Sequence, residues 1–439
     1  MSVPRLLLLT GVAVVAFAQR ADYEGPTILS RGAGTILGGG GEQVRIRPYF
    51  GVNGVYDSGL TSVTVTPDGT IPETSALGVE ASFGAYGYHN WRRTVLGLDY
   101  RGQARHYTRK TYYDGVDQNL TLGITHQASR QWIFTLREAA GTYSRSFGTL
   151  DGYGFFDPNS VGTPSQELFD GRTYYVSTNG DVTYLKSPRL SFGMGGSGMA
   201  VRRRSTALVG LTGETARGDV AWRVNRSNVI GADYGFTHFK YTRSFGATDF
   251  HTAAFNWSVE FARRWQLKLR AGGARVETQG LRYVAVDPLI AAIIGQSTGI
   301  EAFYTLRYVP SGDIRISRSF RRSTVSLSYT RTVDPGNGFY LTSIRNGAEA
   351  SYSRTLRQSW NFGVSAGYFS YQSIGQGLGR YQSFEGGGGF TRRLAGPLHL
   401  VARFDSRWYE AQGTVLRRTH VRGTLGFTFS PGDLPLALW

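Results

Sequence analysis

Apolar and charged residues alternate at a period of two along much of this chain, and this alternation limits the folds that the chain can adopt. It is clearest in Thr94–Tyr107, TVLGLDYRGQARHY, where Leu96 and Leu98 fall on one parity and Asp99 and Arg101 fall on the other. This is the period of a β-strand, whose successive side chains point to opposite faces. In a soluble sheet the apolar face points inward, whereas in a membrane barrel it points outward to lipid.

The composition of the apolar parity favours the membrane. It is rich in Gly, Ala and aromatic residues, whereas a soluble sandwich needs bulky side chains that interdigitate between two sheets. Tryptophans recur at strand ends, as in the aromatic girdles of a membrane barrel. We therefore predict an all-β, transmembrane, antiparallel up-and-down β-barrel with lipid outside and water inside. The apolar parity includes Phe255, Trp257 and Phe261; Trp132, Phe134 and Leu136; and Leu398, Leu400 and Phe404.

Arginine marks the tight connections between strands, and their spacing predicts the strand count. Successive tight turns lie about 35–38 residues apart, with two longer steps of about 58–59, a scale typical of one repeated supersecondary unit. With a first strand over Val44–Tyr56 and a last one over Arg418–Phe429, we expect about eighteen strands, within a range of sixteen to eighteen. Short periplasmic turns would alternate with longer outer loops. The turn arginines are Arg93, Arg130, Arg189, Arg226, Arg264, Arg322, Arg357 and Arg393.

The N-terminus predicts export. Arg5 precedes an apolar run, Leu6–Phe17, which ends in the Ala-Phe-Ala of residues 16–18. This pattern indicates a signal peptide over residues 1–18 that is cleaved after Ala18, because the run is too short for a spanning helix. Residues 19–43 are Gly-rich and predict a flexible periplasmic segment, and residues 44–439 would form the barrel. The predicted location is the outer membrane of a Gram-negative cell.

The charge and the cysteine count narrow the function classes. The chain has 439 residues, no Cys and a formal net charge of +17. The absence of Cys excludes disulfides and Cys-based metal sites. Four of the 48 basic residues are Lys, so the excess is arginine. That excess predicts either a solvated surface or an anion-attracting pore. Nucleic acid is not an expected partner, because the export signal directs the chain elsewhere.

Charged residues at mid-strand on the polar parity are the candidate pore lining. Counting up from the tight turns places four arginines at one height, and two more extend the series outward. We expect Arg101 and Arg137 to lie two strands apart, close enough to act on one solute. The alternative is that these arginines only pair with Asp99, Glu260 and Asp405 and so neutralise charges in the lumen. The predicted pore-lining residues are Arg101, Arg105, Arg137, Arg270, Arg403, Arg407, Asp99, Asp233 and Asp405.

Two long outer loops are candidates for entering the lumen. The third, Gly148–Arg172, carries Asp151, Asp157, Glu167 and Asp170, and these acids would face a basic wall if the loop folded inward as a constriction. The alternative is a loop exposed to solvent or packed on a neighbouring subunit. The sixth, Gly280–Gly312, contains the apolar PLIAAIIG. It would either plug the lumen as a short helix or cap the barrel.

Two acids break the alternation. Glu138 and Glu214 fall on the lipid parity of their strands, where a charge is destabilising. We expect a β-bulge near Ala139 to shift the phase, and the register around Glu214 to be irregular as well.

Catalysis finds little support in the sequence. The seven His are scattered singly, without metal-ligand spacing, and no Ser/His or Asp/His arrangement matches a barrel hydrolase. We therefore predict no catalytic residue, no metal site, no cofactor and no enzymatic activity.

The signal peptide, the alternating strands, the short turns opposite long loops and the last strand VRGTLGFTF together resemble Gram-negative outer-membrane β-barrel proteins of the porin type. Such last strands commonly end in an aromatic residue, whereas here Phe429 is followed by SPGDLPLALW and the terminal aromatic is Trp439. The resemblance implies contact with outer-membrane lipid, insertion by the barrel assembly machinery and, by analogy, a homotrimer.

A barrel of eighteen strands resembles the sugar-specific and substrate-specific porins. This implies a passive, water-filled pore for small hydrophilic solutes, with the basic lining favouring anions or anionic sugars. Outer-membrane polysaccharide exporters are a second family of this architecture and imply export of an acidic polysaccharide with a periplasmic partner. A third reading is a plugged structural or surface-adhesion barrel. A TonB-dependent receptor is not expected, because residues 19–43 are too few for a folded plug.

Overall fold

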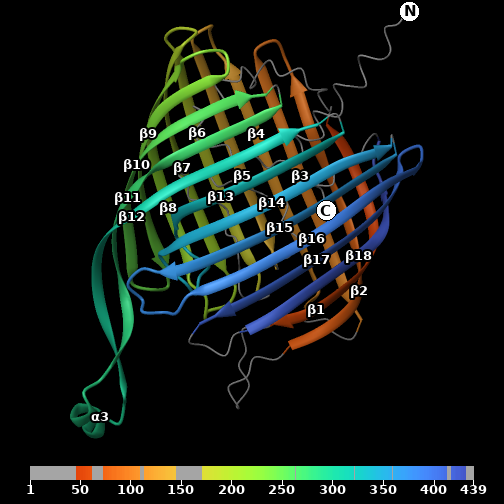
Figure 1. The fold of residues 1–439 in the computed structure, drawn as a ribbon. Helices are drawn as coiled ribbons and strands as arrows, with labels where there is room; N and C mark the ends of the chain where they lie inside the picture. The colour runs from red at the N-terminus through yellow and green to blue at the C-terminus, as the bar shows by residue number, and fades with distance from the viewer. Residues whose placement is uncertain are drawn as a thin grey trace, which may run out of the picture.

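The chain forms one closed barrel of eighteen antiparallel strands (Figure 1). The computed structural model describes residues 46–61, 73–108, 113–144, 171–262, 264–320, 322–357, 359–412 and 417–431. Each strand pairs with its sequence neighbours, and β1 also pairs with β18, which closes the wall. The predicted fold class and strand count are confirmed. The strands are β1 Arg47–Thr61, β2 Glu73–Asn90, β3 Thr94–Tyr107, β4 Gly115–Gln127, β5 Trp132–Tyr143, β6 Thr173–Leu185, β7 Leu190–Arg203, β8 Gly210–Arg223, β9 Asn228–Thr242, β10 Gly246–Phe261, β11 Trp265–Ala285, β12 Thr298–Ser319, β13 Ser323–Asp334, β14 Ser343–Arg357, β15 Trp360–Ser373, β16 Tyr381–Ala395, β17 Leu398–Ala411 and β18 Arg417–Phe429.

Strand boundaries differ slightly from those expected. The first strand begins at Arg47 and extends to Thr61, later than the expected Val44–Tyr56. Arg393 lies inside β16, and its Nε donates to the carbonyl of Gly396 at 2.7 Å, so this tight connection is made by Gly396 and the proline that follows it. Arg393 therefore lies before the turn and donates a hydrogen bond to it, and is not one of the turn residues.

The two parities of each strand separate as the alternation predicts. Phe255 on the outer face of β10 is 50% exposed, whereas Asn256 beside it is fully buried in the interior. The same contrast holds for the exposed Phe404 and the buried Asp405 on β17. Large exposed apolar side chains on the outside and polar side chains inside are the reverse of a soluble protein, and they define a lipid-facing wall.

The height of the apolar wall can be measured along β11. Trp265 starts the strand, and Arg275 is the first charged residue on the outward parity. Ten residues at roughly 3.3 Å each, on a strand tilted by about 40°, span about 25 Å, which matches the apolar band of such barrels. The outer limit of the hydrocarbon on this side therefore lies near Arg275. Within the described residues, no helix is long and apolar enough to cross a membrane.

The expected β-bulge near Ala139 and the expected irregular register around Glu214 are both wrong. Both strands keep an unbroken register, with Glu138 opposite Leu122 and Thr178, and Glu214 opposite Gly198 and His238. Both glutamates lie on the outer face. The Thr178 hydroxyl donates to Glu138 at 2.6 Å.

Glu214 lies on the outer face because the outward side chains of the neighbouring strands are also polar at this point. Glu214 is opposite His238 on β9, His238 is opposite Asp249 on β10, and Asp249 is opposite Glu277 on β11. The His238 Nδ1 lies 2.5 Å from the Asp249 Oδ1. The outward-facing residues of this row are thus acids or His on four neighbouring strands. The wall has therefore left the hydrocarbon here, and the outward parity is free to become polar.

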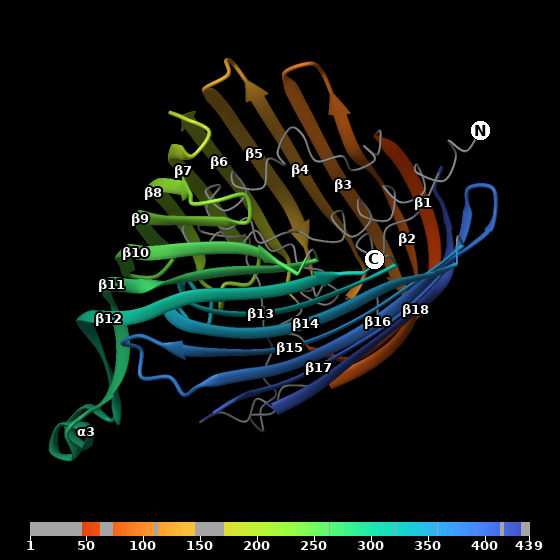
Figure 2. The same cartoon turned by 45° about the horizontal axis from the view of Figure 1, so that its top comes forward.

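The hairpin of β11 and β12 continues beyond the other strands as a two-stranded ribbon (Figures 1 and 2). A short helix, α3 Pro288–Ile294, lies at its tip, with the Asp287 side chain accepting from the Leu289 N–H and Gly295 ending it in a left-handed conformation. The ribbon leaves the barrel rim. The sixth loop is thus mostly strand, and the expectation that it plugs or caps the lumen is wrong.

The loop between β13 and β14, residues 335–342, turns into the barrel instead. The Thr342 hydroxyl lies 2.5 Å from that of Thr248 on β10, 3.2 Å from that of Thr278 on β11 and 2.9 Å from that of Tyr241 on β9. These three partners are buried on the inward face. The loop therefore lies against the inside of the wall.

Candidate functional site: the barrel interior

One side of the interior is lined by a chain of buried ion pairs across β4, β3, β2 and β18. The guanidinium of Arg105 is bonded to Asp117 and lies 3.7 Å from Glu80. Glu80 also accepts from Arg422 at 2.5 Å. All four side chains are at most 7% exposed. Each charge thus has an opposite charge within contact distance, which is the condition for holding ions away from water.

The same pattern continues onto β16 and β17. Arg403 donates to Asp405 at 2.6 Å, and Arg407 lies 3.2 Å from Glu385. Arg407 also donates to the Tyr381 hydroxyl at 2.6 Å. Three of the predicted lining residues therefore form two ion pairs, one of them with Glu385, an acid that the sequence analysis does not single out.

A further buried ion pair lines the opposite wall. Arg270 on β11 donates two hydrogen bonds to Asp233 on β9, at 3.1 and 2.7 Å, and both side chains are almost fully buried. The Asn256 amide donates to the same carboxylate at 2.6 Å. Asp313 is opposite Arg270 on β12 and accepts from Thr330 at 2.5 Å. Arg270 therefore sits among carboxylates and does not form a bare positive site.

Arg101 keeps contact with solvent. It bonds Asp99 on its own strand at 2.7 and 2.8 Å, with side-chain exposures of 16% for Arg101 and 33% for Asp99. Arg137 is half-buried on the inward parity of β5. The register places Arg101 opposite Asn119 and Asn119 opposite Gly141, so Arg101 and Arg137 do not share a row.

Several interior residues were not predicted from the sequence. Glu80, Asp117, Arg422 and Glu385 complete the ion pairs, and each lies on the polar parity of its strand. The signal that could have found them is pairing across strands. Aligning β2 and β3 from the tight turn between them puts Glu80 opposite Arg105.

The inner loop, residues 335–342, packs on two apolar clusters. Leu341 joins a cluster that lines the inward face of β7 to β12, including Phe239 and Val276, which are fully buried. Tyr340, also fully buried, packs against Tyr381 with ring centroids 6.0 Å apart. Burial raises the pKa of Tyr340 to about 12, and Tyr381 acts in the same direction, so this hydroxyl stays neutral near pH 7.

Glycines allow the sharp turns of this inner loop. Gly336 and Gly338 have φ of +86° and +87°, a left-handed region that favours glycine. A Cβ at Gly338 would meet the guanidinium of Arg203. The carbonyl of Gly338 accepts from the Val209 N–H at 3.0 Å, which ties the loop to the connection before β8.

The predicted constriction acids Asp151, Asp157, Glu167 and Asp170 lie outside the described residues. Among the residues that are described, the β13–β14 loop lies against the inside of the wall. No group of three or more His, Asp and Glu that could hold a metal ion occurs within the described ranges.

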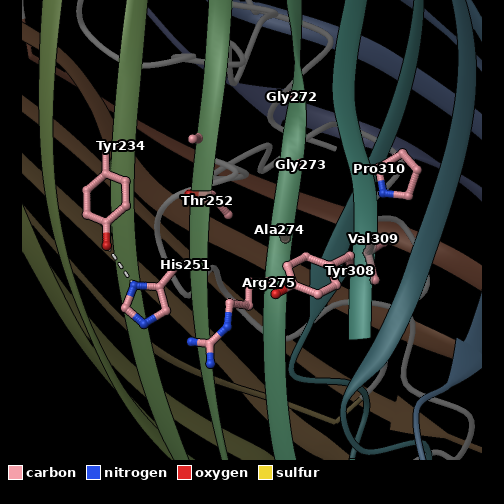
Figure 3. A pocket seen from close by; sticks show the side chains of 11 residues that line it. Tyr234, His251, Thr252, Gly272, Gly273, Ala274, Arg275, Tyr308, Val309 and Pro310 are labelled. Carbon is pink, nitrogen blue, oxygen red and sulfur yellow. Dashed lines mark hydrogen bonds between the residues drawn. The ribbon is translucent and has the colours of Figure 1, made fainter. Parts of the chain in front are cut away.

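The outer wall also carries a groove of about 540 Å³, between β9 and β12 (Figure 3). Its floor is made of small residues, including Ala253 and Gly273. Tyr234 and His251 lie along one side, joined by a 2.6 Å hydrogen bond, and Tyr308 lies along the other. The groove faces outward, away from the interior just described.

A closed eighteen-strand barrel with an apolar exterior, a charged interior and an inward loop has the architecture of a porin-type outer-membrane protein. No family model matches the sequence, and no curated protein matches it. Among solved structures, the outer membrane protein opdK from Pseudomonas aeruginosa is 11% identical, with a TM-score of 0.40 over 88% of this chain and 99% of that chain. OccK9 (OpdG) from the same organism is 11% identical, with 0.42 over 88% and 98%. OccAB1 from Acinetobacter baumannii is 12% identical, with 0.40 over 88% and 96%. The class assigned here rests on this chain's own strand count, closure and exterior.

Proposed function

We propose that this protein forms a passive, water-filled pore in the outer membrane for small hydrophilic solutes, with a modest preference for anions. The observation that carries the proposal is the charged interior that still reaches solvent. The Asp99 and Arg101 pair is partly exposed, and Glu349 on the inward parity of β14 is exposed. No energy source is required, because charged walls and pore width alone select the solute.

The pairing of charges supports a modest rather than a strong preference. Ion pairs place both signs side by side, so their fields largely cancel a short distance away. The preference for anions would come from the excess of arginine. We expect solutes with separated charges, such as acidic sugars, to be oriented by the adjacent acid and base of the wall.

Single-channel current in a planar bilayer under a KCl gradient tests this function. We expect open steps whose reversal potential indicates anion selectivity. Arg101→Ala combined with Arg137→Ala is expected to reduce that selectivity. Arg93→Ala combined with Arg130→Ala is the matched control, because it removes the same charge from two tight turns outside the lumen. Cation selectivity of the unmodified protein would contradict the anion preference and leave the pore intact.

A second candidate function is favoured by the inner loop. The β13–β14 loop and its apolar cluster occupy interior space on the side of β7 to β12, which supports a plugged structural barrel. The two functions are separated by Phe339→Gly combined with Tyr340→Gly, which shortens two side chains of the loop. If the protein is a pore, the unmodified barrel conducts and the double variant conducts more. If the barrel is plugged, the unmodified protein shows no conductance.

Other features of the proposed protein remain predictions. These are the cleaved signal peptide over residues 1–18, insertion by the assembly machinery, the homotrimer and the exporter alternative. N-terminal sequencing of protein purified from the outer membrane would test the first. Sedimentation in detergent would test the third.

A further inference from the structure

β12 has one edge along which no described strand pairs over much of its length. β13 pairs with β12 only from Gly312 onward, so β11 is the one described strand that pairs with Thr298–Ser311. The strand edge is therefore open over fourteen residues, along the part of the ribbon that extends beyond the barrel wall (Figure 2). An open edge presents a row of backbone donors and acceptors that only another strand can satisfy in full.

The carbonyl of Pro310 shows which residues point to the open side. It accepts from Arg331 of β13 at 3.1 Å, so Pro310 points away from β11. Further along, the Ser319 N–H bonds toward β11 and the Phe320 N–H bonds toward β13, in the same alternation. The pairing with β11 has no register shift. The even-numbered residues of Ile300–Tyr308 thus point both their backbone N–H and their backbone C=O toward the open edge.

The open edge lacks most of the features that usually protect one. Ile300, Tyr304 and Tyr308 are 64%, 65% and 76% exposed, and they alternate along one face of a segment rich in aromatic and β-branched residues. The only proline is Pro310, at the barrel end of the open stretch. Phe303 on the opposite face rests against Gly375, which anchors the ribbon by its face and leaves the edge open. Long, apolar, unprotected edges promote strand pairing.

The sequence of this edge is complementary to itself. In an antiparallel pair centred on Tyr304, Glu301 of each copy lies opposite Arg307 of the other. The same register pairs Ile300 with Tyr308 and places only even-numbered residues in the hydrogen-bonded positions, as the open edge requires. Opposite charges directly across strands stabilise pairing, and like charges oppose it. Glu301 already lies 3.0 Å from Arg282, and at 51% side-chain exposure it can still contact a second arginine.

We propose that two copies of this chain associate through the open edge of β12, in an antiparallel pair centred on Tyr304. The two-fold axis of such a pair is perpendicular to the ribbon. If the ribbon lies flat on the membrane, the two barrels share one membrane. If it stands upright, the pair joins barrels in two facing membranes. The proposal does not depend on whether the pore conducts.

Disulfide trapping tests the register, since the chain has no Cys of its own. Tyr304→Cys in the full mature protein places two thiols opposite each other across the two-fold axis, within the span of a disulfide. Thr305→Cys is the matched control, because its two thiols lie diagonally, beyond the roughly 7 Å limit between Cα atoms. We expect a covalent dimer on mild oxidation of the first variant only. Equal cross-linking of both variants, or none of the first, would overturn the proposal.

Charge reversal provides a second readout by sedimentation in detergent. Arg307→Glu is expected to weaken the dimer several-fold, since it sets two acids face to face. Adding Glu301→Arg to the same chain should restore it. A protein that stays monomeric at tens of micromolar would overturn the proposal. Clustering of proteoliposomes that contain the unmodified protein, abolished by Arg307→Glu, would place the pair between facing membranes; a dimer without clustering would place it in one.

Discussion

Along β1 to β4 and β16 to β18, buried acids and arginines form ion pairs inside the barrel, whereas along β7 to β12 many of the corresponding positions hold apolar side chains and threonines. Both surfaces face the same interior. The inward face of a barrel can thus be charged where acids and arginines pair. It can also be apolar where another part of the chain packs on it. The inner loop, residues 335–342, is that cover, because Leu341 and Thr342 contact the apolar side of the wall directly.

The largest effect is expected on the charged side. Glu80→Ala removes the carboxylate to which buried Arg422 donates, and breaking a buried ion pair costs about 3–5 kcal/mol in the free energy of unfolding. Urea unfolding in detergent, followed by tryptophan fluorescence, measures it. Glu349→Ala is the control, because that side chain is exposed, and it should change stability by less than about 0.5 kcal/mol. Similar losses from both variants would argue against a wall held by buried pairs.

On the apolar side, Leu341→Ala is expected to lower the free energy of unfolding by about 2 kcal/mol, near the lower end for a buried leucine, because the residue belongs to a loop. The loss should be the same at low and high salt, since no charge is involved. A salt-dependent loss would mean that the loop is held by charges and would remove the contrast between the two sides.

Thr342→Val tests the hydroxyl contacts between the inner loop and the wall. The change keeps the shape and removes the group that lies near Thr248, Thr278 and Tyr241. We expect a loss of about 1 kcal/mol in the free energy of unfolding, the usual net value of a hydrogen bond. A larger single-channel conductance in the same variant would show that the loop also limits the pore. Unchanged stability and unchanged conductance together would mean that the loop is held by its apolar contacts alone.

The smallest change in stability is expected from Asp99→Asn. This ion pair with Arg101 is partly exposed, and such pairs contribute about 0–1 kcal/mol. The ion selectivity should nevertheless shift toward anions, because a negative charge that reaches the lumen is removed. Reversal potentials measured before and after the change check this. An unchanged reversal potential would place the pair outside the conducting path.

Much of the barrel could be read from the sequence because lipid and water impose a strict alternation on every strand. That alternation, with the arginines at tight turns, was enough to predict eighteen strands. The ends of strands were less predictable. At Glu214 the outward parity becomes polar while the inward parity holds Leu211, which is 4% exposed. Where a strand leaves the hydrocarbon, its outward residues become polar and its inward residues can become apolar, although the register continues unbroken. A prediction based on alternation alone mistakes this change for a β-bulge.

The interior was less predictable than the wall. Arg270 and Asp233 were both expected inside, yet their partnership joins β9 to β11 across an intervening strand and depends on a register that one sequence does not provide. The sequence also did not show that residues 335–342 are the loop that folds into the barrel. Residues 335–342 are short, carry two glycines and no acid, and lacked the charge that made the third loop the expected constriction. Their apolar Phe339, Tyr340 and Leu341 were the available signal.

The seam between β1 and β18 has a consequence for how the molecule is made. Its register pairs Phe50 with Phe429, so residues from opposite ends of the barrel sequence become neighbours. Every other seam joins strands that follow one another along the chain, whereas this one must wait for the last strand, and contacts between distant residues form slowly. Until then both β1 and β18 are unpaired edges that other chains can join. The time between export and closure is thus the interval in which this protein most needs protection from aggregation.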